Sequence, residues 1–127
     1  ITLTWRCSPR WAPPEGESRV DVAHRTREVV DELVDREPEW SEHPAVLVAH
    51  GGAIAALTAA LLELPVDQYP MFNGLGNTCW VQLSAHPRPD PSWGETAAPE
   101  VAPTTDGAKD LLWRLDQWNA GVPLEAS

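Results

Sequence analysis

The stretch 45–63 constrains what this chain can fold into more than any other. It comprises a short apolar run, the tripeptide His50-Gly51-Gly52 and then an alanine- and leucine-rich run. A continuous apolar run of this length predicts a strand, Ala45–Ala49, covered on both faces as in a parallel sheet. The run Ala53–Glu63 predicts a helix, because a proline follows just beyond its end. This order of elements is typical of an α/β fold.

The residues between this strand and this helix are candidates for an anion site. His50 would lie at the carboxyl end of a buried strand, where open α/β sheets bind their ligands. Gly51 and Gly52 would form the turn into the helix, with unpaired N–H groups and the positive end of the helix dipole facing His50. This geometry suits phosphate. We therefore predict His50, Gly51 and Gly52 as phosphate-binding residues.

Two other interpretations of this stretch are weaker. Positions 45–62 contain no charged residue, so their length fits a membrane span. The His-Gly-Gly interruption opposes a span, because it falls where a span would be most apolar. His50 would also fit a satisfied core histidine, but its position at a strand end before two glycines favours a site. We expect no membrane as partner.

Charge and cysteine content exclude several classes of function. The formal net charge is −10, with 19 Asp and Glu against 9 Lys and Arg, so a nucleic-acid partner is not expected. Cys7 and Cys79 lack the spacing of a zinc site and do not argue for secretion. We expect neither a metal nor another cofactor. No signal peptide is visible, and none is expected if the chain lacks its true start. We expect a cytoplasmic protein.

Further elements follow from local patterns. Ser18-Arg-Val-Asp21 matches a capping box, and the apolar spacing after it predicts a helix that ends near Arg36. Thr78–Ser84 and Leu111–Asp116 are interpreted as strands, the second with a helix as its alternative. Residues 86–105 form a proline-rich loop.

The predicted sheet is incomplete. A strand that is apolar on both faces needs neighbours at both edges and helices on both sides, and few remain in this chain. The first residue is Ile1, and the only methionine is Met71. We therefore expect residues 1–127 to be the C-terminal portion of a single larger domain.

Four segments in order resemble the histidine phosphatase, or phosphoglycerate mutase-like, superfamily. They are Gly16-Glu17-Ser18 at a helix start, Val46–Gly52, Gly76–Trp80 at a strand start, and Trp113–Asn119 as a last strand. The resemblance covers about the first 85 residues and a segment near the end. It implies a three-layer α/β/α fold with a mostly parallel sheet, incomplete in this chain.

The resemblance also implies a mechanism. Such enzymes transfer phosphate to a nucleophilic histidine in an Arg-His-Gly motif, clamp it with two arginines and a second histidine, and protonate the leaving group with a carboxylic acid. Water then hydrolyses the phosphohistidine. His50 matches the second histidine, whereas Glu17 matches a motif acid that is not the proton donor.

The chain departs from the family pattern, because no Arg-His-Gly occurs in it. We therefore expect the whole protein to be a phosphomonoester hydrolase that acts on small phosphorylated metabolites, such as a sugar phosphoglycerate. We expect this chain on its own to be inactive. Whether the protein forms a homodimer is left open. The alternatives are a non-catalytic phosphate-binding or interaction domain and an α/β-hydrolase. The second is disfavoured because Gly16-Glu-Ser18-Arg-Val20 misses the second glycine of a nucleophile elbow.

Overall fold

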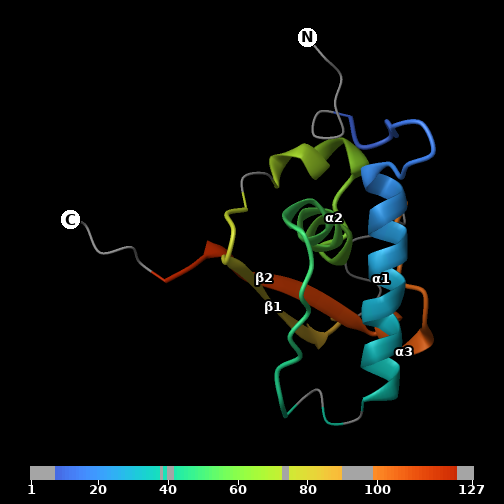
Figure 1. The fold of residues 1–127 in the computed structure, drawn as a ribbon. Coiled ribbons are helices and arrows are strands. Elements are labelled where there is room, and N and C mark those ends of the chain that lie inside the picture. The colour runs from blue at the N-terminus through green and yellow to red at the C-terminus, as the bar shows by residue number, and fades with distance from the viewer. Residues whose placement is uncertain (1–7, 38, 40–41, 73–74, 90–98, 123–127) are drawn as a thin grey trace.

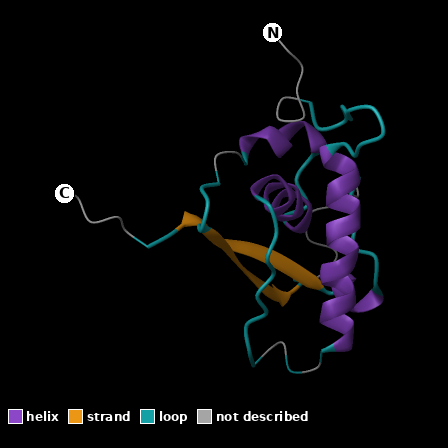
Figure 2. Ribbon diagram, viewed as in Figure 1, coloured by secondary structure: helices purple, strands orange, loops and turns teal. Residues whose placement is uncertain are grey.

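The fold has one central helix with a long helix on one side and a pair of strands on the other (Figure 1). The computed structural model describes residues 8–37, 39, 42–72, 75–89 and 99–122. Figure 2 shows the helices and strands, and the long loops that connect them. In chain order the elements are α1 (Arg19–Arg36), α2 (Gly51–Leu61), the 3₁₀ helix η1 (Val66–Met71), β1 (Trp80–Pro87), α3 (Asp106–Lys109) and β2 (Leu111–Ala120).

Helix α1 begins at the predicted capping box. The Ser18 hydroxyl accepts a hydrogen bond from the Asp21 amide at 3.1 Å, and the Asp21 carboxylate accepts one from the Ser18 amide at 2.9 Å. These two bonds satisfy backbone donors that a helix start leaves unpaired, and they lower the pKa of Asp21. The sequence prediction for this helix is confirmed at both ends.

The core lies between α1 and α2. Helix α2 contributes small side chains to it, which let the two helices approach closely. η1 adds Val66 and Tyr69, and burial raises the pKa of Tyr69 to about 12. The buried apolar cluster comprises Val20, Val22, Ala23, Ala56, Ala59, Ala60, Val66, Tyr69 and Val101.

A buried ion pair crosses this core. Arg27 and Asp31 of α1 are both 0% exposed, with Nε and Oδ1 3.3 Å apart. Arg27 also donates to the Ala60 carbonyl of α2 at 2.7 Å. Asp31 accepts from the amide and the hydroxyl of Thr104, at 2.8 and 2.9 Å. The pair thus connects α1, α2 and the segment that leads into α3.

The predicted strands at 78–84 and 111–116 are confirmed in type. β1 begins two residues later than predicted and ends at Pro87, and β2 continues to Ala120. β1 and β2 pair antiparallel, with Leu83 opposite Leu115. The described residues contain no parallel pair, in contrast to the mostly parallel sheet that the resemblance implies. The long proline-rich segment between the strands is described only in part, and Val101 within it is buried.

The strand prediction for Ala45–Ala49 is wrong for the described chain. The segment is not assigned as a strand, and Val46 and Val48 are 83% and 95% exposed. The physical reason is that an apolar run shows only that both faces of a strand would be buried. The strand itself forms only when its backbone makes hydrogen bonds to a neighbouring strand. Neither described strand, β1 or β2, pairs with segment 45–49. No described helix is long and apolar enough to cross a membrane.

Asp31→Ala should lower the free energy of unfolding by about 3–5 kcal/mol, because it leaves the Arg27 guanidinium buried without its partner. Denaturant unfolding measures the loss. Glu32→Ala is the matched control, since it breaks the Glu32–Arg36 pair at the same helical spacing, where the side chains are 55% and 75% exposed. The control should change the same free energy by less than about 1 kcal/mol. Equal, small losses in both variants would contradict a structural role for the buried pair.

Candidate functional site

His50 lies at the start of α2. It is the N-cap residue, with extended backbone (φ −78°, ψ 153°), and its side chain makes no capping hydrogen bond. Its carbonyl accepts from the Ile54 amide at 3.0 Å, so the intrahelical ladder begins here. Gly51 and Gly52 form the first turn of the helix instead of a separate turn before it, which corrects their predicted place. The unpaired amides of this turn therefore lie next to His50.

A pocket of about 130 Å³ opens beside His50. One wall is the start of α2. The other wall is the segment Leu75–Cys79. The approach is close at Gly51, where a side-chain Cβ would lie 3.5 Å from the Leu75 carbonyl oxygen. The lining residues are Ala49, His50, Gly51, Ile54, Leu75, Gly76, Asn77, Thr78 and Cys79.

The polar groups of this pocket suit an anion. An imidazole, the Asn77 amide and the Thr78 hydroxyl accompany the N-terminus of an 11-residue helix. None of the described lining residues carries a carboxylate, so nothing on the walls repels a phosphate. None carries an arginine or a lysine either. The described walls therefore offer polar groups to an anion but no cation.

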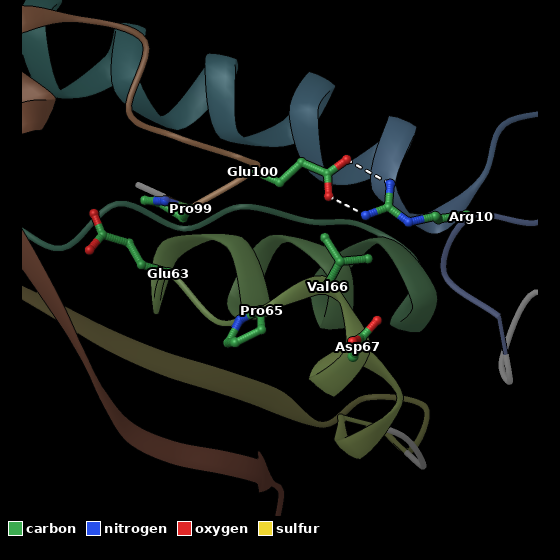
Figure 3. A pocket seen from close by; sticks show the side chains of 7 residues that line it. All are labelled: Arg10, Glu63, Pro65, Val66, Asp67, Pro99 and Glu100. Atoms are coloured by element: carbon green, nitrogen blue, oxygen red, sulfur yellow. Dashed lines mark hydrogen bonds and ion pairs between the residues drawn. The ribbon is translucent and has the colours of Figure 1, made fainter. Parts of the chain in front are cut away.

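A larger pocket, of about 310 Å³, lies away from His50 and has the opposite character (Figure 3). Glu63, Asp67 and Glu100 face it with a single described cation, Arg10. The Arg10 guanidinium points at the Glu100 carboxylate and donates two hydrogen bonds, one of 2.7 Å (Figure 3). These bonds lower the pKa of Glu100. Because the carboxylates outnumber the cation, this pocket disfavours phosphate.

The other residue that the sequence highlights, Glu17, lies outside the His50 pocket. Its carboxylate accepts two hydrogen bonds from Arg25, both 3.0 Å long. The structure therefore brings together the predicted trio His50, Gly51 and Gly52, and separates Glu17 from them. Among the residues that the structure describes, no group of His, Cys, Asp and Glu has the arrangement of metal ligands.

Comparison with known proteins identifies the class. The model of the histidine phosphatase superfamily (branch 1) matches residues 1–90. The chain therefore belongs to this superfamily, as the four sequence segments indicate, and its α/β fold class is confirmed.

Named relatives lie close in sequence. The chain is 52% identical over 124 residues to glucosyl-3-phosphoglycerate phosphatase of Mycolicibacterium vanbaalenii, covering 94% of this chain and 50% of the relative. It is 49% identical over 129 residues to the enzyme of the same name from Mycobacterium tuberculosis, covering 98% of this chain and 51% of the relative. The chain thus spans about half the length of the curated relatives it matches.

Solved structures agree with this assignment. The native structure of a mycobacterial glucosyl-3-phosphoglycerate phosphatase matches with a TM-score of 0.74 and 47% identity, over 93% of this chain and 50% of the other. A structure of that enzyme with inorganic phosphate matches with a TM-score of 0.72 and 48% identity, over 92% and 49%. The described elements therefore have the arrangement found in half of such an enzyme.

Gly51→Ala should leave the melting temperature unchanged or raise it slightly. The new Cβ meets Leu75 only at ordinary contact distances, of 3.5 and 3.7 Å, and alanine favours a helix more than glycine does. Gly16→Ala should lower the melting temperature instead, because its Cβ would lie 2.6 Å from Pro13 Cγ and force a shift. Thermal denaturation compares the two variants. A clear loss of stability in Gly51→Ala would mean that the backbone there requires glycine, and would make this position unsuitable for probing the pocket.

Proposed function

We propose that this chain is the C-terminal portion of a single histidine phosphatase domain, residues 1–127, and that His50 binds the phosphoryl group during phosphomonoester hydrolysis. The observation that supports this most is the place of His50. It lies at the open N-terminus of α2, in a pocket whose described walls carry no carboxylate, in a chain of this superfamily. The amides of Gly51 and Gly52 would assist it.

The chain's own share of the reaction is to bind and orient. An imidazole N–H and helix amides donate to the phosphoryl oxygens, and they stabilise the charge that these oxygens carry in the transition state. The nucleophilic histidine, the clamping arginines and the acid for the leaving group would come from the other half of the domain, since family members carry them in a part that this chain does not match. Water then hydrolyses the phosphohistidine.

The substrate we propose is a small phosphorylated metabolite of the sugar phosphoglycerate kind. The support is the name shared by the relatives from two mycobacterial species, together with their identity of about 50%. The acidic composition, with 19 acids against 9 Lys and Arg, gives no reason to include nucleic acid as a partner. A cytoplasmic location is part of the same proposal.

The exposed segment 45–49 supports the division of the domain. Val46 and Val48 lie almost fully in solvent, and Leu47 is 48% exposed. An extended, exposed apolar segment outside any described sheet is a template for pairing with strands. We propose that strands of the other half pair with it, which would place His50 at the end of a completed central strand.

A chimera tests the catalytic proposal. The half of the M. vanbaalenii relative that lies outside the match would be joined to this chain, and phosphate release from a sugar phosphoglycerate would be measured. We expect turnover, and a loss of about 10²–10³-fold in His50→Ala, because a donor to the developing charge is removed.

His24→Ala is the control, since this histidine is exposed on α1 and does not line the pocket. Its turnover should match that of the unmodified chimera. Retained turnover in His50→Ala would remove this residue from the site. A folded chimera that binds inorganic phosphate without turnover would favour the alternative, a non-catalytic phosphate-binding domain. The lack of a cation among the described lining residues, and of an Arg-His-Gly motif in the chain, also fits this alternative.

The division of the domain predicts the behaviour of the chain on its own. Expressed alone, it should bind a hydrophobic dye or aggregate, because segment 45–49 exposes apolar side chains and unpaired backbone groups. In the chimera, dye fluorescence should fall, since the added half covers that segment. Sedimentation measures aggregation alongside. A monomeric chain with a cooperative melt and no dye binding would instead indicate a self-contained domain.

A further inference from the structure

Two residues beside the His50 pocket have an unusual backbone. Thr78 has φ 64° and Asn119 has φ 55°. Asparagine tolerates this left-handed region, whereas a β-branched threonine is a genuine outlier there. Such conformations persist only where the surroundings enforce them, and they cluster at binding sites. Thr78 lines the pocket itself, and Asn119 lies on β2.

Asn119 belongs to a β-bulge. Trp80 of β1 pairs with Ala120, yet Gln82 pairs with Gln117, so β2 has one more residue than β1 between these pairs. A bulge of this kind turns side chains out of the regular alternation of a strand, and bulges are frequent next to active sites. Here the bulge turns two consecutive side chains toward the segment before β1.

The two side chains hold that segment from both ends. The Trp118 ring packs on Phe72, which follows η1, with ring centres 4.9 Å apart. The Asn119 Oδ1 accepts a hydrogen bond from the Gly76 amide at 2.8 Å. The Gly76 carbonyl in turn accepts from the Cys79 amide at 3.2 Å, which closes a turn with Thr78 as its third residue.

This turn is the wall of the pocket that faces His50. We propose that Asn119 is a positioning residue of the phosphate site, which acts by holding the turn Gly76–Cys79 against the start of α2. The proposal rests on the proposed function of His50. It adds a residue 69 positions further along the chain that does not itself line the pocket but binds Gly76, which does. It also explains why a strained threonine is maintained there.

Three variants separate positioning from mere stability. Asn119→Gly keeps the left-handed backbone, which glycine adopts freely, and removes the acceptor. Asn119→Asp keeps an acceptor oxygen in the same place, and all variants are compared at high ionic strength so that the repulsion between its carboxylate and phosphate is screened. Gln117→Ala is the matched control, because it removes the neighbouring bond from Trp80 Nε1 to Gln117 Oε1, 3.1 Å long, which does not reach the turn.

The measurement is a titration of the chimera, in which this chain is either unmodified or carries one of the variants, with inorganic phosphate. It is followed by the NMR signals of the His50 ring and the Gly76 amide. Asn119→Gly should bind phosphate about five- to tenfold more weakly, as the loss of one hydrogen bond predicts. Asn119→Asp and Gln117→Ala should bind within about twofold of the unmodified chimera. Asn119→Ala provides a second removal of the acceptor if Asn119→Gly does not fold.

Two results would overturn the proposal. One is unchanged phosphate affinity after the acceptor is removed, and the other is an affinity of Asn119→Asp as weak as that of Asn119→Gly. Failure of the proposed function looks different. In that case the unmodified chimera shows no phosphate-dependent shift of the His50 ring at millimolar phosphate, or the shift persists in His50→Ala at the remaining pocket signals.

Discussion

The buried pair of Arg27 and Asp31 is the interaction on which the rest of the structure depends. Both side chains are removed from water, and each has a second partner on a different segment, Ala60 at the end of α2 and Thr104 before α3. Desolvation of two charges offsets much of the attraction between them, so the pair contributes less to stability than to specificity. Its partners join α1, α2 and the segment before α3, although Arg27 Nη2 and Asp31 Oδ1 make no hydrogen bond within the described part of the chain.

The same pair also holds the C-terminal end of α2. Arg27 places a cation on a carbonyl in the last turn of the helix, where the negative end of the dipole lies. The opposite end, about 16 Å away for 11 residues, is open beside His50. Arg27 holds the C-terminal end of α2, and the alanines of α2 pack in the core. These contacts together fix the helix that carries His50 and the first amides at its other end.

Local patterns predict much of this fold, and their failures have a common cause. The capping box of α1, the helix after His50 and the strands before and after the long loop all follow from neighbours in sequence. Arg27 and Asp31 do not, because the sequence shows the same i,i+4 pattern for Glu32 and Arg36, which lie in solvent. Only the packing of α2 and Thr104 distinguishes the two pairs.

The site was predicted on one wall only. His50 and the two glycines form a local motif, so their proximity follows from the chain itself. The opposite wall depends on a bulge in β2 that brings Asn119 to Gly76, and a bulge is set by the pairing of strands. The strand prediction for Ala45–Ala49 failed for a related reason, since the apolar pattern describes neighbours that the described chain does not supply.

The distribution of cations gives a last reason to regard the site as half of a clamp. A phosphoryl group in transfer needs positive charge around its oxygens. Yet every described arginine and lysine is already engaged, and none lines the His50 pocket. Arg19 donates to the Phe72 carbonyl, and the others form ion pairs, namely Arg10–Glu100, Arg25–Glu17, Arg27–Asp31, Arg36–Glu32, Arg88–Glu63, Lys109–Asp106 and Arg114–Asp116. Recruiting any of the seven paired cations would break an ion pair and leave a carboxylate in a strongly acidic chain. Cations from the other half of the domain, approaching along segment 45–49, would complete the clamp without that cost.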